Sequence, residues 1–369
     1  MKLAEIDTPA LVIDIELAEK NIQTMHDFLA PKKCNLRSHT KIHKSPFLAH
    51  KQIAGGSSGI TCAKLGEAQV MAQAGISDIL IANEIIGKQK TQRLANLAKY
   101  CDLKVAVDDL GNVRDISSAA SAAGSTVGLV VDVNLSGGGL SGENRLEGVL
   151  NRCGVPSPKA AADLAVEISK LPNVRLRGVM GYEGGLPENP DIEVSKSITR
   201  QALERLVGAK DAIEDRGIEV GFVSCGSSTS FKVAADTPGI TEIQAGSYIL
   251  MDTYHHRYSP EFDYALWLVA QVISLPKPDR AILDAGGNAI SGDAGLPELR
   301  IKRDDMKVVE LNAEHLHVET HGAKLARGDR LEIVASNIDT TTCLHDNYVV
   351  TRKGEVEMLL PVAARGKFQ

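Results

Sequence analysis

Short apolar runs alternate with amphipathic stretches over the first two thirds of the chain. After an opening strand at 10–14, β-type runs lie near 34–38, 59–63, 78–83, 103–108, 126–133, 174–180, 219–225 and 240–246. Apolar positions at helical spacing predict helices over 17–29, 65–74, 87–99, 158–170 and 193–215. Helical crossovers return a chain to a parallel sheet, so eight such units predict a closed (β/α)8 TIM-type barrel of the α/β class.

An open, doubly wound sheet is the alternative for the same alternation of elements. Such sheets usually carry a Gly-x-Gly-x-x-Gly turn after the first strand. That turn is missing from this sequence. The pattern therefore favours the barrel.

The pattern of apolar and polar residues changes after residue 264. Runs such as RAILDAG, KVVELNA, RLEIVAS and EVEMLLPV alternate with Gly, Pro, Asp and Asn turns, and no helix is needed there. A length of 369 residues also favours two domains. We expect a barrel over 1–250 and a β-rich domain over 251–369.

Composition and charge narrow the class of ligand. The formal net charge of −6 gives no electrostatic reason to expect nucleic acid or an anionic membrane as partner, so small molecules are favoured. No apolar stretch of 18 residues occurs, and the N-terminus lacks a signal-peptide pattern, which predicts a cytoplasmic protein. The six cysteines are scattered and are expected to be reduced.

Two glycine turns follow the last two predicted barrel strands, where barrels of this type commonly bind phosphate. The first is Gly226-Ser227-Ser228 and the second is Gly246-Ser247-Tyr248. Their backbone N–H and hydroxyl groups suit a phosphate dianion. Ordinary glycine turns with hydroxyl caps are the alternative interpretation.

Basic residues gather after the first barrel strand, in LRSHTKIHK: Arg37, His39, Lys41, His43 and Lys44. A lysine crowded by other cations loses its proton more easily, as a lysine that forms a Schiff base requires. A solvated basic loop is the alternative. Together with the phosphate turns, the lysine predicts an aldehyde cofactor with a phosphate group, pyridoxal 5'-phosphate.

Several longer motifs then resemble one known group. They are DTPALVID at 7–14, LRSHTKIHK at 36–44, NRCGV at 151–155, GSSTS at 226–230, GSYILMD at 246–252, LDAGGNAIS at 283–291, AEHLH at 313–317 and GDRLEIV at 328–334. In this order they resemble the fold-type III pyridoxal-phosphate enzymes, in the D-threonine aldolase and D-serine dehydratase branch related to alanine racemase. The resemblance runs nearly end to end and implies an alanine racemase-like barrel followed by a mostly β domain.

The resemblance also implies residue roles. Lys41 matches the Schiff-base lysine, Arg152 the arginine that faces the cofactor ring, and Tyr182 an aromatic contact beside it. The cofactor-binding set implied is Lys41, His39, Arg152, Tyr182, Gly226, Ser227, Ser228, Gly246, Ser247 and Tyr248. Family members are similar in forming head-to-tail homodimers, which would place Tyr254, His255 and His256 near the subunit boundary.

The sequence departs from the branch at the place of its metal pair. A divalent metal is held there by His-x-Cys or His-x-Asp, whereas this chain has Asn337 and Asp339. Two oxygen ligands suit magnesium, calcium or manganese and disfavour zinc. Cys343 and His345 lie a few residues on and are the alternative, softer ligands.

Two further departures concern the catalytic end of the barrel. Gly184, Gly185 and Leu186 stand where many aldolases of the branch have a histidine, so a candidate base is missing. A glycine-rich insertion at 136–150 precedes NRCGV, and loops at this end commonly set substrate choice.

Retro-aldol cleavage of a D-configured β-hydroxy-α-amino acid, giving glycine and an aldehyde, is the activity that the resemblance implies. β-Elimination, as in a D-serine or 3-hydroxyaspartate dehydratase, is one alternative. A metal-independent racemase or epimerase, with Lys41 as the base on one face, is another. A cofactor carrier without turnover is a third, which the extra β-rich domain disfavours.

Overall fold

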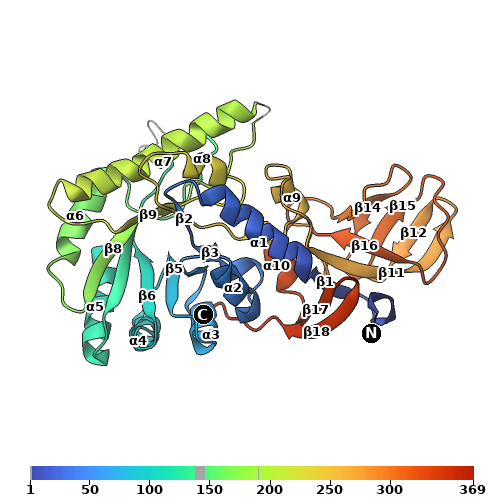
Figure 1. Ribbon diagram of the computed structural model, residues 1–369, viewed down its shortest axis with the longest axis horizontal. Helices are drawn as coiled ribbons and strands as arrows, with labels where there is room; N and C mark the ends of the chain where they lie inside the picture. Colours follow the sequence, from blue (N-terminus) through green and yellow to red (C-terminus); the bar gives the residue numbers. More distant parts are fainter. Residues whose placement is uncertain (1, 138–145, 190) are drawn as a thin grey trace. The chain divides into compact units, whose positions relative to one another are not determined.

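The computed structural model describes residues 2–137, 146–189 and 191–369, which divide into two compact units (Figure 1). The barrel unit contains residues 26–41, 46–246 and 367–369. The β-rich unit contains the residues up to Met25, 42–45 and 247–366. By their contacts, residues 247–366 and the N-terminal segment belong to the β-rich unit.

The barrel unit is built on a parallel sheet with the order β2-β10-β9-β8-β7-β6-β5-β4-β3 (Figure 1). Strands β2 (Asn35–Leu36) and β3 (Ser38–His39) lie in one extended segment. The first half pairs with β10 and the second half with β4, which closes the sheet into a barrel. The other strands are β4 (Ile60–Cys62), β5 (Asp78–Glu84), β6 (Asp102–Val107), β7 (Val127–Asp132), β8 (Val174–Met180), β9 (Phe222–Cys225) and β10 (Glu242–Ile243). The predicted barrel is confirmed.

Helices alternate with these strands, and five of them lie at the ranges that the apolar spacing predicts, whereas those at 46–54, 110–123 and 231–235 were not predicted. The helices are α1 (Ile15–Leu29), α2 (Pro46–Ala54), α3 (Leu65–Gln73), α4 (Lys88–Leu97), α5 (Leu110–Ala123), α6 (Pro158–Ile168), α7 (Ile192–Glu214) and α8 (Phe231–Ala235). Local signals fix several ends: Asp109 and Ser157 cap α5 and α6 through side-chain oxygens, and Gly124 ends α5 with a φ of 67°.

Charged side chains cross the amino end of the barrel. Buried Arg37 pairs with Glu242 at 2.9 Å and with Asp78, and buried Lys104 reaches Asp78 and Asp102 at 2.9 and 2.8 Å. Asp78, Asp102 and Glu242 each begin a barrel strand. Two carboxylates therefore compensate the charge of Arg37.

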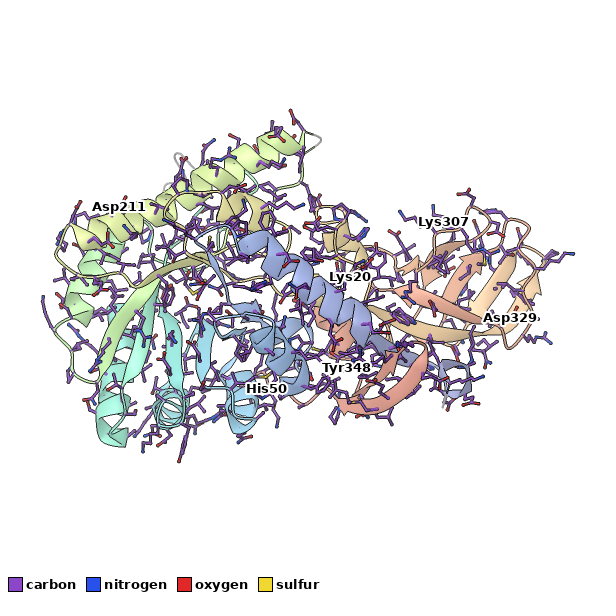
Figure 2. The ribbon with its side chains drawn as sticks, viewed as in Figure 1. Lys20, His50, Asp211, Lys307, Asp329 and Tyr348 are labelled. Carbon is purple, nitrogen blue, oxygen red and sulfur yellow. The ribbon has the colours of Figure 1, made fainter. Side chains whose placement is uncertain are left out.

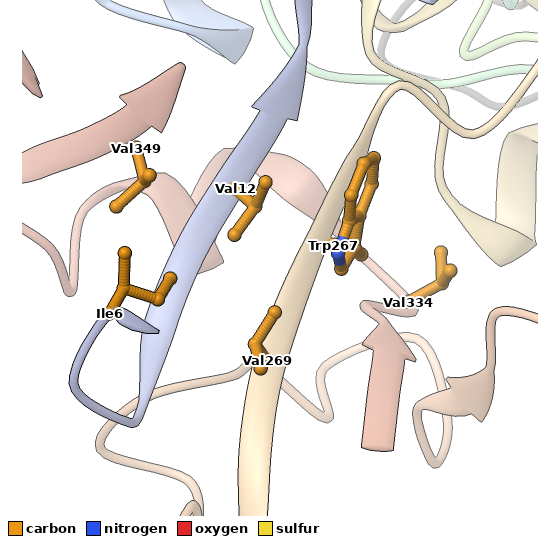
Figure 3. Close-up of a cluster of buried hydrophobic side chains, with 6 residues drawn as sticks. All are labelled: Ile6, Val12, Trp267, Val269, Val334 and Val349. Atoms are coloured by element: carbon orange, nitrogen blue, oxygen red, sulfur yellow. The ribbon is translucent and has the colours of Figure 1, made fainter. Parts of the chain in front are cut away.

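The β-rich unit is a second sheet, with β1 (Ala10–Asp14) at its centre between β11 and β17. Its other strands are β11 (Leu266–Lys277), β12 (Arg280–Leu283), β13 (Glu298–Leu299), β14 (Lys307–Leu311), β15 (Leu316–Glu319), β16 (Arg330–Val334), β17 (Asn347–Arg352) and β18 (Glu355–Pro361). Figure 3 shows a cluster of buried hydrophobic side chains on and beside β1: Ile6, Val12, Trp267, Val269, Val334 and Val349.

Two short helices also occur in the β-rich unit, α9 (Thr253–His256) and α10 (Ile338–Thr342). The expectation of no helix after residue 264 was therefore wrong at α10. Its sequence, IDTTT, consists mostly of β-branched residues and is only five residues long, so no helical period is visible. The helix begins at this point because the Asn337 side chain accepts the Asp339 N–H as a cap.

The outer surfaces of both units are charged. Exposed side chains such as Lys20, Asp211, Lys307 and Asp329 are spread over them (Figure 2). Among the helices of the described residues, none combines the length and the apolar character that crossing a membrane requires.

Candidate active site

Lys41 lies directly after β3, at the carboxyl end of the first barrel strand, where barrels of this kind carry their active sites. It is half-buried in a short 3-10 helix, Thr40–Ile42. The hydroxyl of buried Thr40 donates to Glu67 Oε1 over 2.7 Å, and Glu67 Oε2 accepts the Ala63 N–H over 2.9 Å. The Lys41 N–H faces His39 Nδ1 at 3.4 Å. Glu67 thus connects the Thr40 side chain, next to the lysine, with the backbone of the following loop.

The segment that carries Arg152 is fastened to the ends of two barrel strands. Cys153 Sγ donates to Asp132 Oδ2 over 3.0 Å, and the Gly154 N–H donates to Asp108 Oδ2 over 3.0 Å. Asp132 ends β7 and Asp108 directly follows β6. These carboxylates hold the segment at the same end of the barrel as Lys41.

Asp132 belongs to a cluster with Glu84 and Cys153, whose ligand-type atoms all lie within 4.8 Å of one another. Burial, helped by Glu84 and Asp108, raises the pKa of Asp132 to about 7. Burial and Asp132 raise the pKa of the Cys153 thiol to about 12. A thiol must lose its proton to bind a metal, so we interpret this cluster as one that holds protons.

Asp132→Asn is expected to make the stability of the apo-protein less dependent on pH. Because the folded pKa is raised from 3.8 to about 7, the protonated form is favoured in the fold. The contribution of Asp132 to the free energy of unfolding is therefore at its maximum below about pH 4. It falls by about 1.4 kcal/mol per pH unit up to about pH 7. In urea unfolding, the free energy of unfolding of the variant should rise relative to that of the wild type as the pH increases across this range. The exposed control Asp115→Asn should show a constant difference, and a constant difference for Asp132→Asn would contradict this prediction.

Arg152 and Tyr182 lie together at this end of the barrel. Arg152 is exposed, and its guanidinium carbon lies 5.8 Å from the centroid of the Tyr182 ring. Tyr182 is half-buried and follows β8. The structure therefore brings two predicted residues into contact distance, in an arrangement typical of a cation over an aromatic ring.

Glu183 supports the predicted phosphate turn after β9 through a hydrogen bond from Ser230. Gly226 has a φ of 84°, and Ser227 Oγ lies 3.0 Å from the hydroxyls of both Thr229 and Ser230. Ser230 in turn donates to Glu183, which is fully buried. Glu183 directly follows Tyr182, so one carboxyl group connects the tyrosine loop with the phosphate turn.

The chemistry of this turn fits a phosphate group. Its donors are neutral hydroxyl and backbone N–H groups, which suit a dianion. Burial raises the pKa of Glu183, which favours its uncharged form, and its Oε2 has no hydrogen-bond partner among the described residues. The direction of this pKa shift is compatible with an anion at the turn.

The second predicted turn, Gly246-Ser247-Tyr248, follows β10. Gly246 and Ser247 are buried. Tyr248 is also fully buried, and its ring centroid lies 5.8 Å from that of Phe262. Its ring is therefore a core group of the β-rich unit, and its phosphate contact stays a prediction.

The predicted metal pair lies at the beginning of α10. Asn337 Oδ1 accepts the Asp339 N–H over 2.9 Å and so caps the helix. Cys343 Sγ donates to the Asp339 carbonyl over 3.3 Å, and His345 Nε2 lies 2.7 Å from the Ala289 carbonyl. Burial lowers the pKa of His345. Asn337, Cys343 and His345 thus each make a hydrogen bond here, and the metal pair stays a prediction.

Four site residues escaped sequence reasoning: Glu67, Glu84, Asp132 and Glu183. Glu84 and Asp132 end apolar strands, and an acid in that position was a readable signal of a functional barrel rim. Glu67 and Glu183 gave no such signal, because their partners are distant in sequence. Of the insertion at 136–150, residues 138–145 lie outside the described residues.

A barrel with a lysine after its first strand, an arginine loop and two phosphate-type turns is the architecture of an alanine racemase-like enzyme. The model of the alanine racemase N-terminal domain matches residues 13–253, and that of a putative serine dehydratase domain matches 265–351. The chain belongs to the alanine racemase N-terminal domain family. Pyridoxal phosphate is the cofactor expected of this family.

Aldolases are among the relatives that match over nearly the whole chain. The chain is 35% identical to 3-hydroxy-D-aspartate aldolase of Paracoccus denitrificans (strain Pd 1222), covering 100% of this chain and 94% of the relative. It is 33% identical to D-threonine aldolase of an Arthrobacter species, covering 99% and 94%. The crystal structure of D-threonine aldolase from Filomicrobium marinum matches with a TM-score of 0.92 and 32% identity, covering 100% and 98%.

A dehydratase is also a relative. The chain is 30% identical to D-threo-3-hydroxyaspartate dehydratase of Delftia sp. (strain HT23), covering 79% of this chain and 75% of that protein. Both identity and coverage are lower than for the aldolases. The similarity therefore favours an aldolase over a dehydratase.

Proposed function

We propose that this protein is a pyridoxal-phosphate-dependent lyase that cleaves D-configured β-hydroxy-α-amino acids into glycine and an aldehyde. The observation that supports it most is the full-length similarity to two aldolases of such substrates. The position of Lys41 at the carboxyl end of β3, on the end of the barrel that carries Arg152 and Tyr182, is consistent with this chemistry. We propose 3-hydroxyaspartate and threonine, in their D forms, as the first substrates to test.

Each predicted residue has a defined task in this proposal. Lys41 would hold the cofactor through Nζ and would carry a proton at that atom. When bound, pyridoxal phosphate supplies the electron sink for the bond that breaks. Arg152 orients the ring from its loop, and Tyr182 limits its movement. The Gly226 and Gly246 turns bind the phosphate.

We also propose a divalent cation at Asn337 and Asp339, where it would polarise the β-hydroxyl of the substrate. Removal of metal with EDTA is expected to lower the aldolase rate at least about tenfold, with magnesium or manganese restoring it better than zinc. Asn337→His rebuilds a His-x-Asp pair and should shift the preference toward zinc and manganese. A rate indifferent to EDTA in both proteins would remove the metal from the proposal.

Proton NMR of turnover in deuterated buffer tests the function directly. The loaded protein is incubated with D-threonine, L-threonine, D-serine and D-3-hydroxyaspartate. Glycine plus an aldehyde supports the aldolase; a 2-oxo acid plus ammonia would replace it with a dehydratase. Deuterium at Cα with loss of optical activity would replace it with a racemase. Cofactor binding without turnover of any substrate would leave the carrier role.

A head-to-tail homodimer is a further expectation from the resemblance, with Tyr254, His255 and His256 near the boundary. We propose this assembly for the loaded enzyme. Sedimentation equilibrium measures it directly, and a monomer at micromolar concentration would contradict it.

A further inference from the structure

Three side chains of the β-rich unit form a hydrogen-bonded chain that ends at the second predicted phosphate turn. Asp252 Oδ1 lies 2.7 Å from His255 Nδ1, and His255 Nε2 lies 3.1 Å from the Ser247 hydroxyl. Asp252 and Ser247 are buried, whereas the His255 side chain retains 22% exposure. The chain therefore connects a partly exposed imidazole to a buried hydroxyl of the turn.

Asp252 fixes the orientation of the imidazole. Its Oδ1 also accepts the backbone N–H of His255 over 2.8 Å, and its Oδ2 accepts the N–H of Ile338 over 3.2 Å. With both oxygens engaged, the carboxylate cannot turn away from Nδ1. We therefore assign the Nδ1 proton to the bond with Asp252, which leaves Nε2 as the nitrogen whose protonation changes.

We propose that His255 is a positioning residue for the cofactor phosphate, acting through Ser247; this inference rests on the proposed function. When the imidazole is neutral, Nε2 accepts the Ser247 O–H, so only oxygen lone pairs face a phosphate. When the imidazole is protonated, Nε2–H donates to Ser247 Oγ, and the hydroxyl hydrogen is free to donate to a phosphate oxygen. Phosphate binding and protonation of His255 therefore favour each other.

The surroundings of the imidazole are consistent with such coupling. Asp252 is the charged group that the described contacts place against the ring. The Tyr254 ring meets the His255 ring edge-on at 5.2 Å, and Tyr258 packs on Tyr254 at 5.8 Å. Phenols are uncharged at neutral pH. His256, the next residue, packs instead against Tyr264 at 4.5 Å and offers a matched control.

The test is the dissociation constant of pyridoxal phosphate from the full-length protein, measured by equilibrium dialysis at pH 6 and pH 8.5. His255→Ala should weaken binding about fivefold to tenfold at pH 6 and by less than about twofold at pH 8.5. His255→Gln keeps an N–H donor near Ser247 and should stay close to the wild type at pH 6, with a flatter pH profile. His256→Ala should follow the wild type. Pyridoxal, which lacks the phosphate, should bind all four proteins alike.

Three results would overturn the inference while leaving the proposed function standing. They are an unchanged constant in His255→Ala at pH 6, an equal loss at both pH values, and an equal loss of affinity for pyridoxal. A wild-type protein that binds no pyridoxal phosphate would overturn the proposed function and this inference together.

Discussion

Lys41→Ala is expected to remove both the visible absorbance of the cofactor-loaded protein and its lyase activity. No other group is assigned the covalent link to the cofactor, and the same amine carries the proton during exchange with the substrate. The loss of rate should reach about 10³-fold or more, since a positioned proton carrier alone contributes about 10²- to 10⁴-fold. Absorbance spectra and initial rates of glycine formation measure the two effects.

Lys41→Arg is the matched control for charge. It keeps a cation on the same 3-10 helix but has no amine that can form a Schiff base. We expect it to be as inactive and as colourless as Lys41→Ala, while its Tm stays within a few degrees of the wild type. Activity in either variant would show that the cofactor lysine lies elsewhere.

Gly154→Ala is expected to damage both stability and activity. Gly154 has a φ of 100°, and an added Cβ would lie 2.5 Å from the Asn134 nitrogen and 2.7 Å from the Val133 carbonyl carbon. Both are backbone atoms that cannot rotate away. The strained conformation and the displaced backbone should cost about 2–4 kcal/mol of folding free energy. Arg152 lies two residues away, so the rate should fall by more than about tenfold.

Gly124→Ala separates these two causes. Gly124 also has a positive φ, 67°, but no atom lies within 4 Å of an added Cβ there. This control should lose about 1–2 kcal/mol and keep full activity. Urea unfolding and steady-state kinetics on both variants give the comparison. Equal losses of stability would show that the contact with residues 133 and 134 is unimportant.

The sequence predicts the barrel well because its signal is local and repeated. Each strand and each long helix shows its own apolar period, and their alternation alone implies the topology. The division of the first barrel strand at Arg37 could not be predicted, because the strand changes there from pairing with β10 to pairing with β4, and β10 lies far along the chain. The same holds for strand β1, whose partners begin at Leu266 and Asn347.

The candidate site shows the same limit. Lys41, Arg152 and Tyr182 stand in recognisable motifs, and the structure places the last two side by side. The carboxyl groups that support these residues lie in no such motif. Glu67 and Glu183 accept hydrogen bonds from Thr40 and Ser230, and no spacing rule connects these residues. Motifs point to the residues proposed to contact ligands, whereas the supporting carboxyl groups become visible only in the folded structure.

The pairing of β1 has a consequence for synthesis on the ribosome. Leu11 pairs with Leu268, and Val12 pairs with Val349, so the N-terminal strand waits until most of the chain has been translated. At about 5–20 residues per second, the interval before β11 emerges is on the order of half a minute. During that time Ala10–Asp14 is an apolar strand with two unpaired edges, which is a site of mispairing between nascent chains. The yield of folded protein should therefore depend more on the translation rate and the chaperone supply than on the stability of the folded state.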